Sequence, residues 1–141
     1  MRSLARNVAR LARVEKAALE RLGSLGEGLT HNDYRSANVF LNSEDQPVIF
    51  DWDTASYGPP GATLRILARR PEEELSEWVK IYCDHLEAKG WPCAENDVRF
   101  SIRAAEVFHA LAFGARISDH PANPGEKLIR WGLENLHYLS G

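Results

Sequence analysis

The stretch "HNDYRSANVF", residues 31–40, decides the fold together with "VIFDWD", residues 48–53. A histidine and then Asp33 open the first stretch, and Asn38 stands directly before an apolar run. The second stretch begins with three apolar residues and then carries the acidic residues Asp51 and Asp53. Side chains that carry polar oxygens therefore flank a short apolar unit, a pattern that indicates a site at the end of a small sheet.

Residues 38–42 and 47–52 are apolar and rich in residues that favour strands, and the polar "SEDQ" separates them. Two such runs joined by a short polar turn predict a β-hairpin. A hairpin brings its two ends together, so Asn38 at its start and Asp51 at its end become near neighbours. The sequence thus predicts a cluster of oxygen ligands at one end of the hairpin, with Asp33 on the adjoining loop.

Hard cations such as Mg²⁺ take one or two protein oxygens, several waters and the phosphates of a substrate. Asn38 and Asp51 suit that role. Asp33 is not needed as a ligand, which leaves it free to accept a proton from an attacking hydroxyl or to orient it. Taken alone, the same residues also have a structural interpretation, in which Asp33 and Asn38 make Asx turns and Asp53 caps a following turn.

These motifs resemble the catalytic half of a protein-kinase-like phosphotransferase, in which an H-x-D-x-x-x-x-N loop precedes a metal-binding Asp on the next hairpin. The closer resemblance is to the aminoglycoside phosphotransferase and choline kinase family. Its members carry an HGD-x-x-x-x-N loop and then a strand that ends in Asp-Trp-Asp or Asp-Trp-Glu. "HNDYRSANVF" and "VIFDWD" match both pieces in order, and "SYGPPGATLRIL", residues 56–67, is similar to the family's Gly-Pro segment.

The resemblance implies a function for each matching position. Asp33 would be the catalytic base, and Asn38 and Asp51 would hold the Mg²⁺ that accompanies ATP. The implied reaction is ATP-dependent phosphorylation of a hydroxyl on an aminoglycoside-, choline- or sugar-like acceptor.

Three neighbouring residues receive supporting or peripheral roles, and a fourth receives none. His31 would be a structural member of the loop, bonded to backbone or to the metal-binding Asp. Arg35 would stabilise the loop, and Asp53 would be peripheral to the site. Trp52 is interpreted as an ordinary core residue.

Two residues depart from the family's pattern. Asn32 replaces the usual glycine, so the backbone there must suit an asparagine, which tolerates left-handed geometry. Thr63 stands where the family commonly has an Asp that braces the loop. A hydroxyl can hydrogen-bond but brings no charge, so we expect weaker bracing.

The resemblance covers about residues 1–120 and lies wholly in the carboxy-terminal lobe. No G-x-G-x-x-G loop and no amino-terminal nucleotide lobe are seen, so we expect a fragment or a lobe-only relative. Two functions stay open: a phosphotransferase active only within a fuller protein or complex, or a non-enzymatic module that binds a metal, a nucleotide or a protein. A surface left bare by the missing lobe would favour a homodimer or a partner in its place.

The rest of the chain is mostly helical. Apolar periodicity and Gly/Pro breaks predict helices over residues 1–22, 63–69, 71–89, 95–117 and 124–139. Asn123 is predicted to cap the last of them, and Leu29 and Thr30 form a stub of strand. We therefore predict a mostly helical α+β fold in which a small hairpin carries the catalytic loop. With 141 residues, the chain is expected to be one domain, residues 1–141.

Composition excludes several other classes of protein. Hydrophobic residues make up 44% and charged residues 26%, as in ordinary globular proteins. No apolar run approaches the roughly 20 residues of a membrane span, and no signal-peptide core is present, so we expect a cytoplasmic protein without a membrane partner. Cys83 and Cys93 have no metal spacing and are expected to be reduced and packed rather than bridged.

Charge is unevenly distributed along the chain. Residues 1–22 carry six basic side chains against two acidic ones, although the whole chain has a net charge of −3. The basic residues lie opposite an apolar helical stripe, and without interleaved aromatics they indicate a solvated face rather than a nucleic-acid partner. Acidic residues at 72–77, Asp84, Glu87 and Glu106 could line a pocket for a cationic acceptor. We favour solvated helix faces for them.

Overall fold

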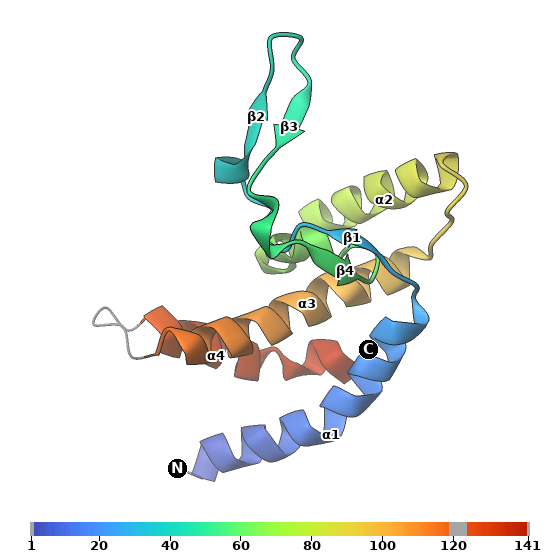
Figure 1. The fold of residues 1–141 in the computed structure, drawn as a ribbon. Helices are drawn as coiled ribbons and strands as arrows, with labels where there is room; N and C mark the ends of the chain where they lie inside the picture. Colours follow the sequence, from blue (N-terminus) through green and yellow to red (C-terminus); the bar gives the residue numbers. More distant parts are fainter. Residues whose placement is uncertain (1, 119–123, 141) are drawn as a thin grey trace. The chain divides into compact units, whose positions relative to one another are not determined.

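The computed structural model describes residues 2–118 and 124–140 (Figure 1). Helices make up most of these residues, and the strands among them form two antiparallel pairs. The predicted mostly helical α+β class is therefore confirmed. Within the described ranges, no helix combines the length and the apolar character needed to cross a membrane.

Contacts divide the chain into two compact units. We call residues 25–102 the loop unit, and residues 1–24 with 103–141 the helical unit. The boundary falls within helix α3 (Glu95–Arg116). The expectation of a single domain rested on chain length and stays a prediction.

Strands β2 (Val39–Leu41) and β3 (Pro47–Ile49) form the predicted hairpin of the loop unit. They pair antiparallel, and the first residue of β2 stands opposite the last residue of β3. Asn42 holds the turn, because its side-chain oxygen accepts hydrogen bonds of 2.9 Å from the backbone N–H groups of Glu44 and Gln46. Figure 1 shows the hairpin projecting from the rest of the loop unit, to which the chain returns at the hairpin's base.

Strand β1 (Gly28–Thr30) pairs antiparallel with β4 (Ser56–Gly58), a strand that the sequence did not predict. The sequence predicts a stub of strand at Leu29 and Thr30, whereas its Gly-Pro segment indicates only a break. A Cβ atom at Gly58 would stand 2.9 Å from the Thr30 hydroxyl oxygen, so the glycine permits the close approach of the two strands. Strand β1 of this pair ends at Thr30, directly before the loop of residues 31–38.

The core of the loop unit lies among three helical segments: η3 (Ala62–Arg69, a 3₁₀ helix), α2 (Glu72–Ala88) and the first residues of α3. All three closely match predicted helices. Each contributes buried apolar side chains to one cluster: Ala68, Leu75, Val79, Cys83, Val98 and Ile102. The Tyr82 hydroxyl accepts a hydrogen bond of 3.1 Å from the N–H of Gly61, whose φ of 86° turns the chain into η3.

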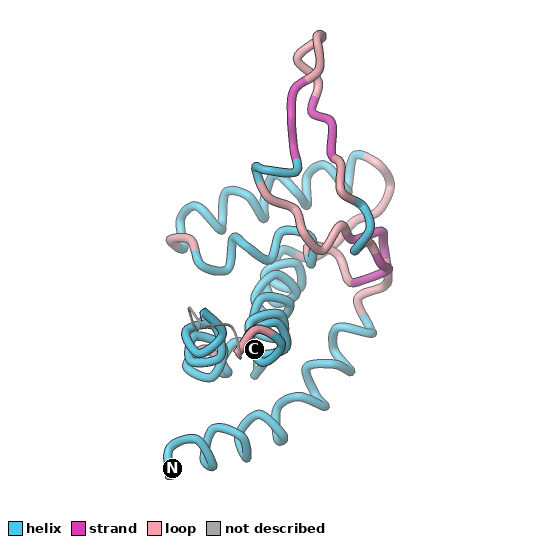
Figure 2. Tube along the Cα trace, turned by 60° about the vertical axis from the view of Figure 1, so that its left-hand side comes forward, coloured by secondary structure: helices cyan, strands magenta, loops and turns pink. Residues whose placement is uncertain are grey.

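In the helical unit, α1 (Arg2–Ser24) packs on the 3₁₀ segment η4 (Leu136–Ser140). The predicted apolar stripe of α1 is confirmed where its side chains are described, since Ala18 is buried and Leu11, Val14 and Leu22 are half-buried. Helix α4 (Pro124–Glu134) runs beside the second part of α3 (Figure 1, Figure 2). Glycines allow this contact, because a Cβ atom at Gly114 would stand 2.9 Å from the Gly125 carbonyl oxygen.

The last helix ends earlier than predicted. α4 stops at Glu134 instead of continuing to Leu139, and the chain continues as η4. The Asn135 side chain donates a 2.8 Å hydrogen bond to the Trp131 carbonyl oxygen and so competes with the backbone ladder at this point. The predicted cap, Asn123, lies outside the described residues.

Candidate active site

His31 opens the site loop (residues 31–38) and is buried, with 2% of its surface exposed. Its Nε2 lies 2.8 Å from the Phe50 carbonyl oxygen. Because a carbonyl oxygen can only accept, Nε2 carries the proton and donates it. Nδ1 then accepts a 3.3 Å hydrogen bond from the backbone N–H of Asp33. Through these two bonds, the His31 ring ties the site loop to Phe50, the residue directly before Asp51.

Asp33 uses one carboxylate oxygen for its contacts. Its Oδ2 accepts a 3.0 Å hydrogen bond from the Asn38 amide and lies 3.1 Å from Nε of Arg35. The same amide nitrogen donates to the Asp33 carbonyl oxygen at 2.9 Å. Within residues 2–118 and 124–140, Oδ1 has no hydrogen-bond partner, and the side chain is 33% exposed. The arrangement leaves one basic oxygen available to a substrate.

Asn38 ends the short 3₁₀ segment η1 (Ser36–Asn38) and is buried, with 4% exposed. Its amide nitrogen faces Asp33, so the amide oxygen points elsewhere and has no partner in the described part of the chain. Its carbonyl oxygen accepts a 3.1 Å hydrogen bond from the Phe50 N–H, which extends the hairpin ladder by one step. Asn38 and Asp51 therefore lie at the same end of the hairpin, as its topology predicts.

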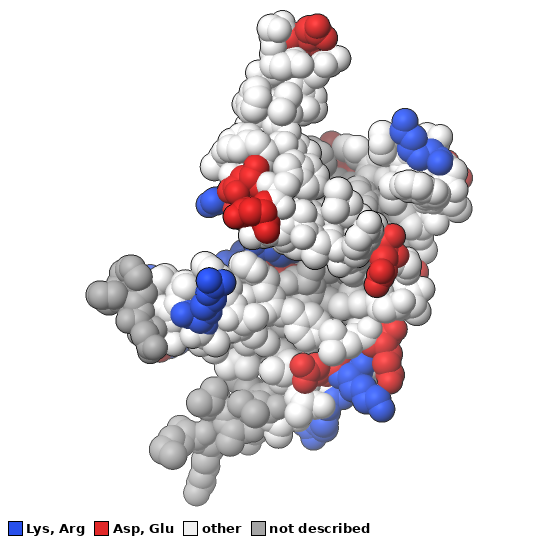
Figure 3. Space-filling view, in the orientation of Figure 1, with Lys and Arg blue, Asp and Glu red and all other residues white. Residues whose placement is uncertain are grey.

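Asp51 lies in a group of like charges. Its pKa is raised, first by a hydrogen bond and repulsion from Asp53, then by burial and by the charge of Asp33, while Arg35 opposes the shift. Figure 3 shows acidic side chains gathered at the base of the hairpin. The resemblance gives Asp53 a peripheral role, and its carboxyl group is the largest influence on the pKa of Asp51. Closely spaced carboxylates of this kind attract a cation.

A sequence model of the phosphotransferase enzyme family matches residues 2–96, a span that runs from α1 through the site loop and hairpin to the start of α3. The chain belongs to this family. No curated protein and no solved structure matches the chain. The family match confirms the resemblance drawn from the two motifs, and the helical fold with its small hairpin fits a kinase-like lobe.

In this member of the phosphotransferase enzyme family, Asn32 has a left-handed backbone, with φ of 65°. Its side-chain amide donates to the Thr54 carbonyl oxygen at 2.7 Å and to the Ser56 hydroxyl oxygen at 2.8 Å. The Thr54 hydroxyl in turn donates to the His31 carbonyl oxygen at 3.1 Å. Asn32 thus accepts the geometry usual for glycine and also fastens the site loop to β4, a contact that the sequence did not reveal.

Two residues of η3 also brace the site loop. The Thr63 hydroxyl oxygen accepts a 3.1 Å hydrogen bond from the His31 N–H. Arg65 donates a 3.2 Å hydrogen bond to the Asn32 carbonyl oxygen. The weaker bracing expected of Thr63 stays a prediction, but the loop also receives a cationic donor. Sequence reasoning missed Arg65, and its place on the same short segment as Thr63 was the only available signal.

The prediction that Trp52 is a core residue is wrong, because the side chain is 43% exposed. Its indole N–H donates a 2.8 Å hydrogen bond to the Ile49 carbonyl oxygen. Its ring meets His31 edge to face, with the ring centroids 4.6 Å apart. Trp52 therefore shields the buried imidazole at the hairpin base instead of entering the helical core.

Three of the acidic residues considered for acceptor binding make ion pairs at the surface. Glu72 pairs with Arg99, Glu74 with Arg70 and Asp84 with Lys80. These contacts favour the solvated interpretation. Glu106 is an exception, because only 2% of it is exposed and it cannot belong to a solvated face.

Proposed function

We propose that this chain carries the phosphoryl-transfer site of an ATP-dependent kinase that acts on a hydroxyl of a small molecule, of an aminoglycoside-, choline- or sugar-like kind. Family membership supports the reaction class. The observation that carries the proposal is the state of Asp33, which is fixed through Oδ2 and open at Oδ1.

Asp33 acts on the acceptor in this proposal. Its open oxygen receives the hydroxyl proton or orients the hydroxyl towards the phosphorus. Phosphoryl transfer demands little covalent chemistry from a protein, so positioning and charge stabilisation supply most of the acceleration. The Asn38 amide and Arg35 serve this purpose because they limit the orientations open to the carboxylate.

The donor set at the hairpin base fits Mg²⁺. The amide oxygen of Asn38 is unengaged, and Asp51 is held beside like charges that a cation relieves. In the described ranges, no three His, Cys, Asp or Glu side chains are grouped to hold a metal, but Mg²⁺ bound with a nucleotide needs only one or two protein oxygens. Asn38 and Asp51 would hold the ion, which when bound offsets the charge of the phosphates.

Phosphate transfer from radiolabelled ATP to a panel of aminoglycosides, choline and sugars tests the proposal in the complete gene product. Asp33→Asn should lower the rate by about 100-fold or more, because the open oxygen loses its basicity. Asp45→Asn makes the same chemical change at the exposed hairpin turn and should leave the rate unchanged. Transfer that persists in Asp33→Asn, or no transfer by the wild type to any acceptor, contradicts the proposal.

A further inference from the structure

Two cysteines of the loop unit meet in space. Cys83 lies towards the end of α2, and Cys93 follows the turn that leads into α3. Their sulfur atoms are 3.5 Å apart, and the Cys93 thiol donates a weak hydrogen bond to Cys83. Both are free thiols, as the sequence predicted, but their contact was not foreseen.

We propose that Cys83 and Cys93 form a redox-active pair that converts reversibly into an intramolecular disulfide. A disulfide bond is about 2.05 Å long, so the two sulfurs need to approach by roughly 1.5 Å. The turn that carries Cys93 can supply this movement. It begins at Gly90, whose φ is 82° and around which a Cβ atom would meet nothing within 4 Å.

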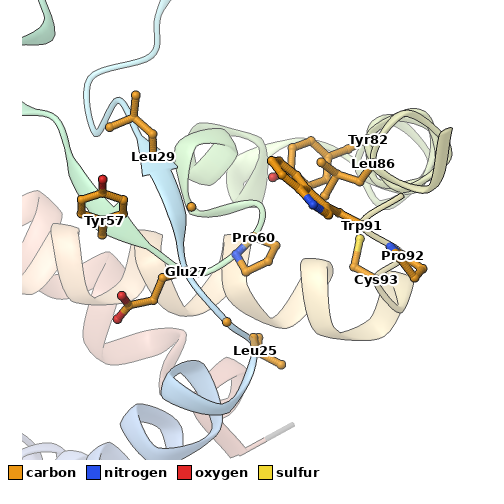
Figure 4. Close-up of a pocket in the computed structure, with 12 residues that line it drawn as sticks. Leu25, Glu27, Leu29, Tyr57, Pro60, Tyr82, Leu86, Trp91, Pro92 and Cys93 are labelled. Carbon is orange, nitrogen blue, oxygen red and sulfur yellow. The ribbon is translucent and has the colours of Figure 1, made fainter. Parts of the chain in front are cut away.

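The two thiols differ in their access to a reagent. Cys83 is 7% exposed and packs in the core cluster with Val79 and Val98. Cys93 is half-buried and lines a pocket of about 700 Å³. Figure 4 shows it beside Trp91 at the edge of this pocket. A small oxidant therefore reaches Cys93 first.

The surroundings of Cys83 make it the slower partner. The pKa of its thiol is raised to about 12, first by burial and then by the hydrogen bond and charge of Cys93. The carboxylates of Glu95 and Asp84 also disfavour the thiolate, and the Tyr82 hydroxyl is a further titratable group close by. Because the thiolate is the reactive form, Cys83 is a poor first nucleophile near neutral pH.

The reaction then has two exchange steps with a low-molecular-weight disulfide such as oxidised glutathione. The Cys93 thiolate attacks one sulfur of that disulfide, forms a mixed disulfide and releases one glutathione thiolate. Cys83 next loses its proton to solvent and attacks the Cys93 sulfur. The second glutathione leaves as its thiolate, so two protein thiols are oxidised while one glutathione disulfide is reduced to two thiols.

The disulfide would link α2 to the turn before α3. It would thereby fix one wall of the pocket, which Trp91, Pro92 and Cys93 form on the side away from Tyr57 and Leu29 (Figure 4). The shape of this pocket in the loop unit would then depend on the redox state of the pair.

Mass spectrometry with peptide mapping tests the pair after the purified chain is treated with oxidised glutathione. The wild type should give an internal Cys83–Cys93 disulfide without a retained adduct, and dithiothreitol should restore both thiols. Cys83→Ser should trap a single glutathione adduct on Cys93. Cys93→Ser should leave Cys83 unmodified over the same time. Resolution of the mixed disulfide should accelerate about tenfold per pH unit from pH 7 to 9, following the thiolate fraction of Cys83.

Three results would overturn the proposal: stable adducts on both cysteines of the wild type, disulfides between chains in place of the internal one, or no reaction at Cys93. If Cys83→Ser does not fold, Cys83→Ala removes the same sulfur without placing a hydroxyl in the core. The wild-type peptide map decides the question even if neither variant folds.

Discussion

At the scale of single residues, the site depends on how Asp33 is oriented. The ion pair with Arg35 is largely exposed, since the two side chains are 57% and 33% accessible. Such a pair contributes at most about 1 kcal/mol. The two hydrogen bonds from Asn38 start from a buried amide, which holds its position more firmly. Asn38 is therefore the main positioning residue for Asp33, and Arg35 is secondary.

The pKa of Asp51 is a measurable sign of the acidic cluster. It should lie above its ordinary value of 3.8 and fall back in Asp53→Asn, because the hydrogen bond and charge of Asp53 are the two largest causes of the shift. A raised folded-state pKa means that the free energy of unfolding increases as pH falls through that pKa. NMR titration of the Asp51 carboxyl carbon checks the shift, and an unchanged titration in Asp53→Asn would show that the two carboxyl groups do not interact.

Substitutions at Asn32 separate its backbone role from its side-chain role. Asn32→Gly keeps the left-handed backbone but loses the bonds to Thr54 and Ser56. Asn32→Ala loses the same bonds and adds about 1–2 kcal/mol of backbone strain. Urea denaturation should therefore rank the alanine variant as less stable than the glycine variant, by roughly that amount. Equal stabilities would mean that the residue does not adopt positive φ in solution.

At the scale of elements, the β1–β4 pair positions the site loop. β1 ends at Thr30, directly before His31, and β4 begins at Ser56, whose hydroxyl receives the Asn32 amide. The pair is short, so its geometry depends on close contact between Thr30 and Gly58. A change in this contact is expected to reach the loop directly.

Gly58→Ala tests this dependence. The added methyl group would stand 2.9 Å from the Thr30 hydroxyl oxygen, and overpacking of this kind costs about 1–3 kcal/mol. Thr30→Ala removes that oxygen, so the double variant should lose less stability than the sum of the two single variants. Thermal unfolding of all four proteins measures the coupling. Strict additivity would mean that the strands are not in contact at this point.

At the scale of the whole molecule, the sequence predicted the features that are encoded locally. The hairpin and the meeting of Asn38 with Asp51 follow from two adjacent strands and the turn between them. The helices of both units follow from periodicity and from Gly/Pro breaks. Family membership follows from the same two motifs, which lie close together in the chain.

The features that were missed depend on contacts between distant residues or on one unusual dihedral angle. The bond from Arg65 to Asn32 joins positions 33 apart, and no local pattern encodes it. In a continuing strand, Asp51 and Asp53 would share one face but would stand roughly 6–7 Å apart along it. The strand instead ends at Ile49, and the left-handed conformation of Asp51 brings the two carboxyl groups together. Trp52 stays near the surface, where its indole N–H finds a partner in the Ile49 carbonyl oxygen.

Calorimetric titration of ADP with and without Mg²⁺ examines the proposed metal and nucleotide site itself. The test variant is Asp51→Asn and its control is Asp45→Asn. Each removes one carboxylate, and the two residues have similar backbone geometry, with φ of 65° and 58°. We expect ADP to bind the wild type and Asp45→Asn in a Mg²⁺-dependent manner, and Asp51→Asn to bind at least about tenfold more weakly, a difference of about 1.4 kcal/mol. Equal binding by all three proteins, independent of Mg²⁺, would contradict a metal-assisted phosphotransferase site at the base of the hairpin.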